Sequence, residues 1–290
     1  MILVAGGTGR LGTILVERLT RRGVAVRVLT RDRERAAHLG ASVELVIGDV
    51  RDRAAAIAAA SGCEIVVSAV HGFVGPAGIS PQTVDRDGNA NLTDAAKANG
   101  ADLVMMSVVG AALDSPMELF RMKRAAEEHA RASGIPTTIV RATAFMELWI
   151  DLLRQTAVRS GRPLVFGRGD NQINFVSAND VAALVDEVVA DPASRGAVLE
   201  IGGPENVTFN DLARAVQAAD GRTAPPRHVP PVGLRLMANT VGRARPQLGR
   251  QARAALAMDS GDLTFGDSGV RRRYPRVPTT RVSDVLRPHV

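Results

Sequence analysis

The sequence predicts an α/β fold: a doubly wound parallel sheet of the Rossmann type, followed by a smaller C-terminal substrate lobe. Up to residue 141, short apolar runs alternate with longer segments of helical character. A glycine-rich turn, Gly6-Gly-Thr-Gly-Arg-Leu-Gly12, joins the first apolar run to the first helical segment. After residue 141 the alternation stops. Regular alternation of strands and helices favours parallel strands that are joined by right-handed crossovers.

Six strands are expected in the first part of the chain. Each run is short, nearly unbroken in apolarity and rich in β-branched residues. Strands that are covered by helices on both faces have this composition, because neither face meets water. The expected strands span residues 2–5, 24–29, 43–47, 64–70, 102–107 and 136–141.

Five helices are expected between these strands. In the first of them, Leu11, Leu15 and Leu19 recur every fourth residue with Ile14 beside them. This spacing places the four side chains in one apolar stripe that can pack on a sheet. The expected helices span residues 10–22, 33–39, 53–60, 84–99 and 116–133.

Fewer regular elements are expected in the rest of the chain. The next helix begins at Ser177 or Asn179, and a later one begins at Thr208 or Asn210, because these side chains can cap a helix. A strand is expected between these two helices, and Gly202-Gly-Pro204, which interrupts regular structure, follows it. The expected elements are helices at 179–190, 208–219 and 248–258, and a strand at 197–201.

This change of pattern predicts two domains. Residues 1–145 are expected to form the Rossmann domain, with residues 175–201 rejoining its sheet. Residues 146–174 and 202–290 are expected to form the smaller substrate lobe. The exact edge between the two depends on whether the segment up to residue 201 returns to the main sheet.

The glycine-rich turn has the composition of a dinucleotide-binding loop. Gly7, Gly9 and Gly12 satisfy G-x-G-x-x-G. Glycine permits the tight turn, the approach of the backbone to a pyrophosphate and the close packing of helix on strand. Helix-terminal N–H groups then stabilise the anion. A P-loop is excluded, because Thr13 follows Gly12 and no lysine is present there. The expected contacts from the loop are Gly6, Thr8, Gly9, Arg10, Leu11 and Gly12.

The end of the second strand favours NADPH over NADH. Thr30 and Arg31 offer a hydroxyl and a planar cation suited to a 2′-phosphate, and Arg10 is expected within reach of the same group. Asp32 argues for NADH, since NAD sites usually place an acid near this position. Arg31 has a simpler explanation too, as a solvated side chain ahead of a helix.

Composition limits the other classes of function. The formal charge is +6, with a sequence pI of about 10.7. Such a charge would favour anionic small molecules or non-specific nucleic-acid binding, although a basic solvated surface is the preferred explanation. Aromatic residues make up only 3% of the chain and no nucleic-acid-binding motif is present, so specific nucleic-acid binding is not expected.

Neither a metal site nor a membrane segment is expected. The histidines, which are His38, His71, His129, His228 and His289, show no ligand spacing. No apolar stretch approaches the roughly 18 residues of a membrane span. The single cysteine, Cys63, forms no internal disulfide and reads as a small core residue. A cytoplasmic location is therefore expected.

Taken together, the motifs resemble the atypical short-chain dehydrogenase/reductases, specifically the NmrA-like branch, which includes NADPH-dependent quinone reductases and redox sensors. The resemblance covers most of the chain. It rests on the glycine loop, Leu29-Thr-Arg-Asp32, Gly48-Asp-Val50, Ser107-Val-Val-Gly110, Phe120-Arg-Met-Lys-Arg-Ala-Ala-Glu127 and Arg141-Ala-Thr-Ala-Phe-Met-Glu147.

The resemblance implies roles for residues after each strand. It implies adenine contacts from Asp49 and Val50, a ribose and pyrophosphate path along Ser68, Ala69 and Val70, a nicotinamide ribose flanked by Ser107 and Lys123, and a nicotinamide beside Thr143 and Phe145. Each has a purely structural alternative. Asp49 ends a strand in a turn, Ser107 caps a loop, and Lys123 faces solvent on a charged helix.

One departure from the family concerns catalysis. Members that reduce carbonyls or epimerise sugars place a tyrosine four residues before the lysine, so that the ammonium lowers the pKa of the phenol. Here that position is Leu119, and the only tyrosine of the chain is Tyr274. The sequence therefore argues against ordinary alcohol dehydrogenase and sugar epimerase chemistry.

Two functions remain open. In the first, the protein reduces a small electrophile such as a quinone, with NADPH as the hydride donor and with Lys123, Ser107 and His71 as the candidate catalytic residues. The acceptor pocket would then contain His71, Phe73, Phe145, Met146 and Trp149, although these aromatics are equally explained as core. In the second, the protein is a non-catalytic NADP(H) sensor that acts through a protein partner. The oligomeric state is not predicted.

Overall fold

The computed structural model describes residues 1–75, 78–158 and 160–287, and the chain divides into two compact units. The first comprises Met1–Ala142, Ala178–Ile201 and Ser268–Pro278. The second comprises Thr143–Ser177, Gly202–Asp267 and Thr279–Val290. In the described part of the chain no helix combines the length and the apolarity that crossing a membrane requires.

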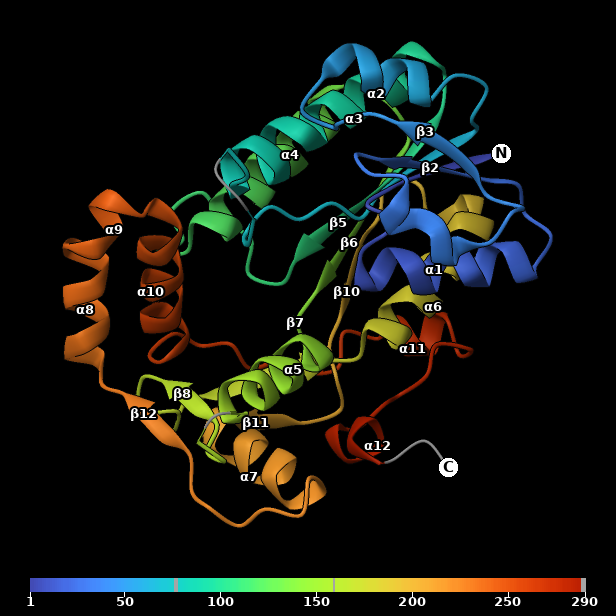
Figure 1. Cartoon of the computed structure of the whole chain (residues 1–290). Coiled ribbons are helices and arrows are strands. Elements are labelled where there is room, and N and C mark those ends of the chain that lie inside the picture. The colour runs from blue at the N-terminus through green and yellow to red at the C-terminus, as the bar shows by residue number, and fades with distance from the viewer. Residues whose placement is uncertain (76–77, 159, 288–290) are drawn as a thin grey trace. The chain divides into compact units, whose positions relative to one another are not determined.

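A parallel seven-stranded sheet forms the centre of the first unit, which confirms the expected fold class (Figure 1). The strand order is β10-β6-β5-β4-β1-β2-β3, so the strands after β1 extend the sheet to one side as far as β3, and those from β4 onward extend it to the other side. In such sheets, ligands bind outside the carboxyl ends of the strands at this switch point. The strands are β1 (Ile2–Ala5), β2 (Val26–Thr30), β3 (Glu44–Ile47), β4 (Ile65–Ser68), β5 (Asp102–Val108), β6 (Thr137–Ala142) and β10 (Val198–Ile201).

Helices cover both faces of this sheet. Helices α1 and α6 lie on one face and α2, α3 and α4 on the other (Figure 1). The side chains between helices and sheet are apolar and fully buried, as Leu3, Leu92 and Leu103 are. The helices are α1 (Arg10–Arg21), α2 (Arg53–Ala59), α3 (Asp87–Ala98), α4 (Glu118–Ala132), α6 (Ala178–Ala190) and α11 (Val270–Arg273).

Two of the segments that were expected to be α-helices contain other kinds of helix. The expected helix at 33–39 is a 3₁₀-helix, η1 (Glu34–Leu39). The expected helix at 84–99 begins earlier, as a π-helix, η2 (Pro81–Arg86), which continues into α3. Ser80 caps η2 through a reciprocal capping box with Thr83, and Pro81 occupies its first position, where its missing N–H costs nothing.

The division of the chain differs from the expected one near the C-terminus. Residues 202–290 were expected in the second lobe, but Ser268–Pro278 belongs to the first unit. Contacts with α6 and with the turn that follows it hold this segment there. Arg271 pairs with buried Asp180 of α6 at 3.1 Å, and the Tyr274 hydroxyl donates a hydrogen bond to Asp191 at 2.7 Å. The short 3₁₀-helix η3 (Pro192–Ser194) follows Asp191.

The second unit contains two small sheets and several helices. Its main core joins Met146, Ile150, Phe175, Leu212 and Val216, and a smaller cluster lies between α8 and α10. The sheets have the orders β11-β9-β7 and β12-β8. The elements are β7 (Ala144–Phe145), α5 (Met146–Ala157), β8 (Leu164–Phe166), β9 (Gln172–Val176), β11 (Asn206–Thr208), α7 (Phe209–Ala219), β12 (Arg227–Val229), α8 (Pro231–Asn239), α9 (Val241–Ala244), α10 (Pro246–Met258) and α12 (Val282–Leu286).

Candidate cofactor site and catalytic residues

The glycine loop joins β1 to α1 and is folded so tightly that side chains do not fit in it. Gly6 has a φ of +87°, which glycine adopts readily, and its carbonyl accepts the Gly9 N–H at 3.0 Å. A Cβ on Gly12 would lie 2.1 Å from the Gly6 oxygen, and one on Gly7 would lie 2.7 Å from the Val28 side chain. Glycine is therefore required for the loop to close against β2 and α1.

The outer side of the loop suits an anion. Gly9 is the N-cap of α1, and neither a capping side chain nor an acid is present in the first turn of this described helix. Gly9 and Arg10 are exposed, and a Cβ on Gly9 would meet only the Gly6 oxygen, at 3.3 Å. Thr8 is half-buried, whereas the Leu11 side chain is buried in the core, so Leu11 offers only its backbone N–H. The residues thus fit a pyrophosphate at a helix N-terminus.

Positive charge lies after β2 and β3. Arg31 is exposed directly after β2, while Oδ1 of Asp32 accepts the Glu34 N–H at 2.8 Å. Asp49 pairs with Arg51 at 2.7 Å. Hydrogen bonding from Arg51 lowers the pKa of Asp49 against the opposing effect of burial, and the charge of Arg31 contributes less. The edge of the sheet after β2 therefore carries the exposed cation of Arg31 next to the carboxylate of Asp32, of which one oxygen accepts the Glu34 N–H.

The side chains of Ser68 and Val70, which were expected along the ribose and pyrophosphate path, are buried within the first unit. Ser68 is fully buried and its hydroxyl donates a hydrogen bond to Asn89 at 2.6 Å. The Val70 side chain is also buried. The Ala69 backbone lies against the glycine loop, because a Cβ on Gly6 would come within 2.5 Å of its oxygen. Val50, half-buried after β3, accepts a hydrogen bond from the Asn91 amide through its carbonyl.

Lys123 lies inside the first unit, and the solvent-facing alternative for this residue is wrong. Its side chain is 4% exposed, and its ammonium donates to the carbonyl oxygens of Val70 at 3.1 Å and Met106 at 3.0 Å. The third contact is an ion pair with Asp85 at 3.1 Å. Two carbonyl oxygens thus accept hydrogen bonds from the ammonium, and the charge of Asp85 balances its charge. Lys123 ties the ends of β4 and β5 to η2.

Asp85 was not among the predicted site residues. It is fully buried on η2, where its Oδ2 accepts the Gly72 N–H at 2.9 Å and its Oδ1 lies 3.5 Å from His71 Nδ1. Burial opposes ionisation, but the charges of Lys123 and His71 outweigh it and lower the pKa of Asp85. The sequence did contain a pattern that predicts the burial of Asp85. Asp85 and Asn89 lie at helical spacing with the apolar residues Val84 and Leu92, so both fall on the buried face of the helix.

Ser107 is also engaged within the fold. Its hydroxyl donates to Glu127 at 2.6 Å, and Glu127 is fully buried. Arg141 approaches the same carboxylate with two nitrogens, at 2.6 and 2.9 Å, and a third contact joins Arg141 to Glu200 at 3.1 Å. Hydrogen bonding to Glu127 is the main reason why the pKa of Arg141 is raised. Ser107 therefore acts here as part of a buried network across α4, β5, β6 and β10.

The expected acceptor pocket is divided between the two units. His71 and Phe73 belong to the first unit, with ring centroids 6.2 Å apart, and the His71 side chain is 48% exposed. Thr143 and Phe145 belong to the second unit, where the Thr143 hydroxyl donates to Asn174 at 2.9 Å. Met146 is fully buried, and Trp149 packs edge-on against Phe209 in the same core. Met146 and Trp149 are thus core residues.

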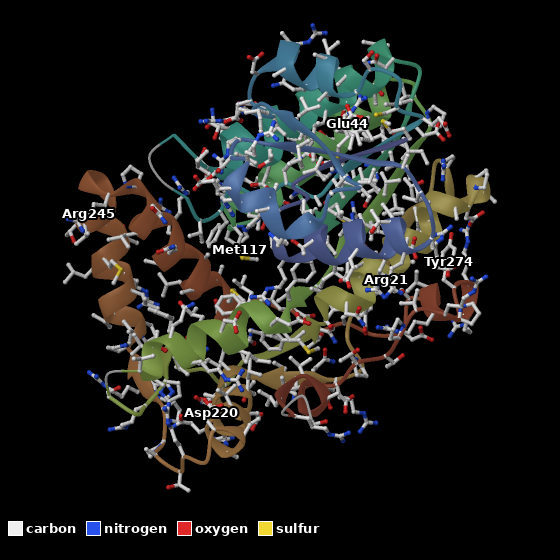
Figure 2. The ribbon with its side chains drawn as sticks, turned by 45° about the vertical axis from the view of Figure 1, so that its right-hand side comes forward. Arg21, Glu44, Met117, Asp220, Arg245 and Tyr274 are labelled. Atoms are coloured by element: carbon white, nitrogen blue, oxygen red, sulfur yellow. The ribbon has the colours of Figure 1, made fainter. Side chains whose placement is uncertain are left out.

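Tyr274 directly follows α11, the short helix that contacts the edge strand β10 (Figure 2). Its partner Asp191 precedes η3, where Ser194 accepts the Thr138 hydroxyl at the start of β6. Only 5% of Tyr274 is exposed. It cannot replace the tyrosine that is missing at Leu119.

We expect Tyr274 to titrate late in the folded protein. Burial, and then the hydrogen bond to Asp191, raise its pKa from 10.0 to about 12. A neutral group whose pKa is raised by folding stabilises the fold fully below pH 10, and this stabilisation is lost as the pH rises to about 12. Because the chain has one tyrosine, tyrosinate absorbance measures it directly. Tyr274→Phe should remove this part of the pH dependence of stability, and tyrosinate forming near pH 10 in the folded protein would contradict the assignment.

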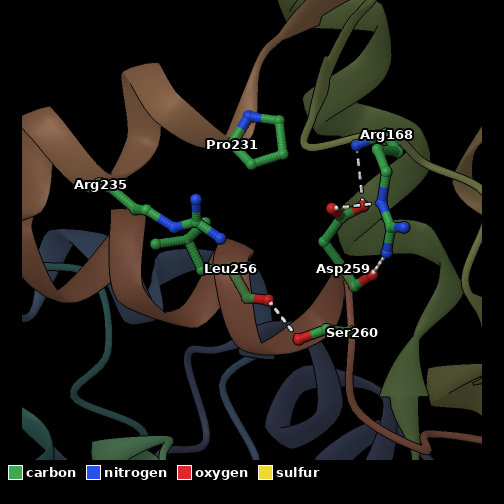
Figure 3. A pocket seen from close by; sticks show the side chains of 6 residues that line it. All are labelled: Arg168, Pro231, Arg235, Leu256, Asp259 and Ser260. Carbon is green, nitrogen blue, oxygen red and sulfur yellow. Dashed lines mark hydrogen bonds and ion pairs between the residues drawn. The ribbon is translucent and has the colours of Figure 1, made fainter.

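The second unit contains a separate pocket of about 470 Å³ (Figure 3). Its wall includes Asp259, whose carboxylate accepts the backbone N–H groups of Arg168 and Gly169 and pairs with the Arg168 guanidinium at 3.2 Å. Asp259 thereby fixes the turn before β9. The lining residues are Arg168, Pro231, Arg235, Leu256, Asp259 and Ser260, none of which was predicted as a site residue.

Within residues 1–75, 78–158 and 160–287, no group of three or more histidine, cysteine, aspartate or glutamate side chains could hold a metal ion. His129 pairs with Asp94 at 3.1 Å on the surface of α4, and His228 contacts the Asn210 side chain at 2.9 Å. His289 lies outside the described residues. Cys63 is buried, as expected for a core residue.

Comparison with known proteins places this geometry among nucleotide-dependent reductases. A family model described as NAD(P)H-binding matches residues 6–192. The NAD(P)H azoreductase of Xenophilus azovorans is 30% identical over 232 residues, which cover 79% of this chain and 76% of that protein. The (4-alkanoyl-5-oxo-2,5-dihydrofuran-3-yl)methyl phosphate reductase of Streptomyces griseus is 30% identical over 225 residues, which cover 77% and 74%.

Solved structures share the fold over the whole chain. The NADPH-dependent quinone oxidoreductase of Escherichia coli, complexed with NADPH, aligns with a TM-score of 0.80 at 23% identity and covers 99% of this chain and 98% of that one. The triphenylmethane reductase of Citrobacter sp., complexed with NADP(H), aligns with a TM-score of 0.79 at 19% identity and covers 98% of both chains. At these identities the likeness concerns the fold.

Proposed function

The chain belongs to the NAD(P)H-binding family and is an NAD(P)H-dependent oxidoreductase, and from this premise we propose that it transfers hydride from NADPH to a small electrophile such as a quinone. The expected resemblance to atypical short-chain dehydrogenase/reductases is thereby confirmed. The choice of NADPH and of the acceptor class is our proposal.

The observation that carries the proposal is the glycine loop at the switch point of the sheet. The loop presents an uncapped helix N-terminus, and the exposed Arg31 follows the neighbouring strand. The cofactor supplies the hydride when bound. The residues that we propose to contact it are Gly6, Thr8, Gly9, Arg10, Leu11, Gly12, Arg31, Asp49, Val50, Ala69, Thr143 and Phe145, with Ser68, Val70 and Lys123 supporting them from within the fold.

The acceptor class follows from the catalytic groups. Leu119 and the distant Tyr274 leave no phenol beside Lys123, so a developing alkoxide would lack its usual proton donor. A quinone accepts hydride readily, because the negative charge is delocalised in the product. The relatives support this direction, since their names describe reduction of azo compounds, quinones and triphenylmethane dyes.

The proposal is tested by titrating NADPH with the protein while its fluorescence is recorded, and then adding quinones and other electrophiles. We expect enhanced emission on binding, followed by protein-dependent decay with at least one quinone. Binding without decay across the panel would favour an NADP(H) sensor that acts through a partner. If neither NADPH nor NADH bound, the cofactor site would be wrong.

We expect Arg31→Ala to raise the KM for NADPH by about 10- to 100-fold and to leave the KM for NADH almost unchanged. Arg31 is exposed, and its charge acts on Asp49 less than Arg51 does, so its removal should spare the fold. A charge-assisted contact to a phosphate contributes about 1.5–3 kcal/mol, which corresponds to this change in affinity. Steady-state kinetics with both cofactors measures it.

Arg33→Ala is the matched control, because Arg33 is also exposed and lies two residues further on. It should leave both KM values near those of the wild type. Equal losses for NADPH and NADH in Arg31→Ala would show that Arg31 does not contact the 2′-phosphate.

A further inference from the structure

Three side chains of the first unit form a line at the carboxyl ends of β4 and β5. Lys123 Nζ lies 3.1 Å from Asp85 Oδ1, and the same oxygen lies 3.5 Å from His71 Nδ1. Lys123 and Asp85 are buried, whereas the side chain of His71 is 48% exposed. The line therefore runs from the interior of the unit to its surface, and His71 is its outer end.

The inner part of this line is held firmly. Asp85 accepts the Gly72 N–H at 2.9 Å, and its own backbone carbonyl accepts the Asn89 amide at 2.8 Å. A Cβ on Gly72 would lie 2.4 Å from the Ser80 oxygen, so the chain after His71 packs directly on η2. Asp85 is carried by a π-helix, a conformation that is found frequently at functional sites.

We infer that Asp85 is a positioning residue that holds His71 with Nδ1 toward the carboxylate and Nε2 toward the acceptor, so that His71 donates the proton that quinone reduction requires. A carboxylate that faces one ring nitrogen of an imidazole sets the orientation of the ring, so that the other nitrogen can serve as a proton donor. Lys123 in turn keeps Asp85 ionised in its buried place. The inference rests on the proposed function.

The step balances with the groups that are present. The quinone gains two electrons and one hydrogen as hydride from NADPH, which is oxidised to NADP⁺. The second hydrogen arrives as a proton: the Nε2–H bond of protonated His71 breaks and an O–H bond of the hydroquinone forms. Because His71 is half-exposed, solvent reprotonates it for the next turnover.

The choice of acceptor separates this role from a structural one. A cationic triphenylmethane dye accepts hydride at its central carbon and becomes neutral, and no proton is consumed. Loss of a proton donor should therefore slow the reduction of a quinone and spare the reduction of the dye. Damage to the fold or to cofactor binding would slow both.

The experiment compares His71→Asn and Asp85→Asn with the wild type, and uses His129→Asn as the control. His129 is a similarly exposed histidine that pairs with an aspartate, Asp94, on the surface of α4. We expect kcat for a quinone to fall about 100-fold in His71→Asn and Asp85→Asn, as for the loss of a general acid. His129→Asn should keep the wild-type kcat, and the KM for NADPH should stay unchanged in all three variants.

A second measurement distinguishes the loss of a proton donor from a loss of stability. Asp85→Asn leaves Lys123 without its charged partner, so we expect it to lower the melting temperature as well as kcat. His71→Ala keeps the Lys123–Asp85 pair, and it is therefore assayed with added imidazole. Imidazole should restore quinone reduction, which a structural role for His71 would not allow. Wild-type quinone turnover in His71→Asn, or equal losses with quinone and dye together with no rescue, would overturn the inference. A wild-type protein that binds NADPH but reduces no acceptor would instead refute the proposed function.

Discussion

Replacing Gly12 by alanine is expected to weaken NADPH binding by about 100-fold, as measured by fluorescence titration. The new Cβ would lie 2.1 Å from the Gly6 oxygen and 2.7 Å from the Gly7 Cα. Both atoms are backbone, so no side-chain rotation relieves the clash and the loop must move away from α1. A displaced loop would lose hydrogen bonds from its N–H groups to the charged pyrophosphate, each of which contributes about 1.5 kcal/mol or more, and a loss of about 2.8 kcal/mol corresponds to a 100-fold change in Kd.

Two further variants separate binding from folding. A Cβ on Gly9 would meet only the Gly6 oxygen at 3.3 Å, so Gly9→Ala should keep the melting temperature while it obstructs the pyrophosphate. Gly266→Ala is the neutral control, because nothing lies within 4 Å of its added Cβ. Wild-type NADPH affinity in both Gly9→Ala and Gly12→Ala would show that the cofactor binds elsewhere.

The main sheet could be predicted from the sequence because its signals are local. Buried parallel strands such as β4 and β5 are short, mostly apolar runs in the sequence. The glycine loop is likewise one continuous segment, Gly6 to Gly12. The second unit was predicted less completely. Its strands β7, β8 and β12 are two or three residues long, too short for any periodicity, and they exist because distant segments pair. Helix α5 did carry a signal, since Met146, Ile150 and Leu153 recur at helical spacing.

The chemistry around Lys123 could not be predicted in the same way. The sequence gives the lysine and the missing tyrosine, but the burial of Lys123 depends on carbonyl groups that lie 17 and 53 residues away. Asp85 becomes a partner only because η2 packs on α4. A motif records which residue types are present, whereas a hydrogen-bond network depends on which segments the fold brings together.

The same principle explains Ser107. The family motif implies that it contacts the nicotinamide ribose, whereas in the structure its hydroxyl donates a hydrogen bond to Glu127. The carboxylate of Glu127 has no exposure, yet Ser107 and two nitrogens of Arg141 approach it within 3 Å. A buried charge of this kind is tolerated only because its partner and hydrogen bonds compensate for its lost hydration. The position of the strand ends near the proposed site therefore depends on this pair.

Glu127→Gln is consequently expected to destabilise the protein by about 3 kcal/mol, the lower part of the usual range for breaking a buried pair. The amide keeps the size of the side chain, but its NH₂ group would face a nitrogen of Arg141, whose charge would stay buried. At this chain length the melting temperature should fall by about 6–12 °C. Glu128→Gln is the matched control: Glu128 is adjacent, 44% exposed and paired with Arg124 at 3.0 Å, so its loss should cost less than about 1 kcal/mol. Similar melting temperatures for the two variants would mean that the Glu127–Arg141 pair does not hold α4 to the sheet.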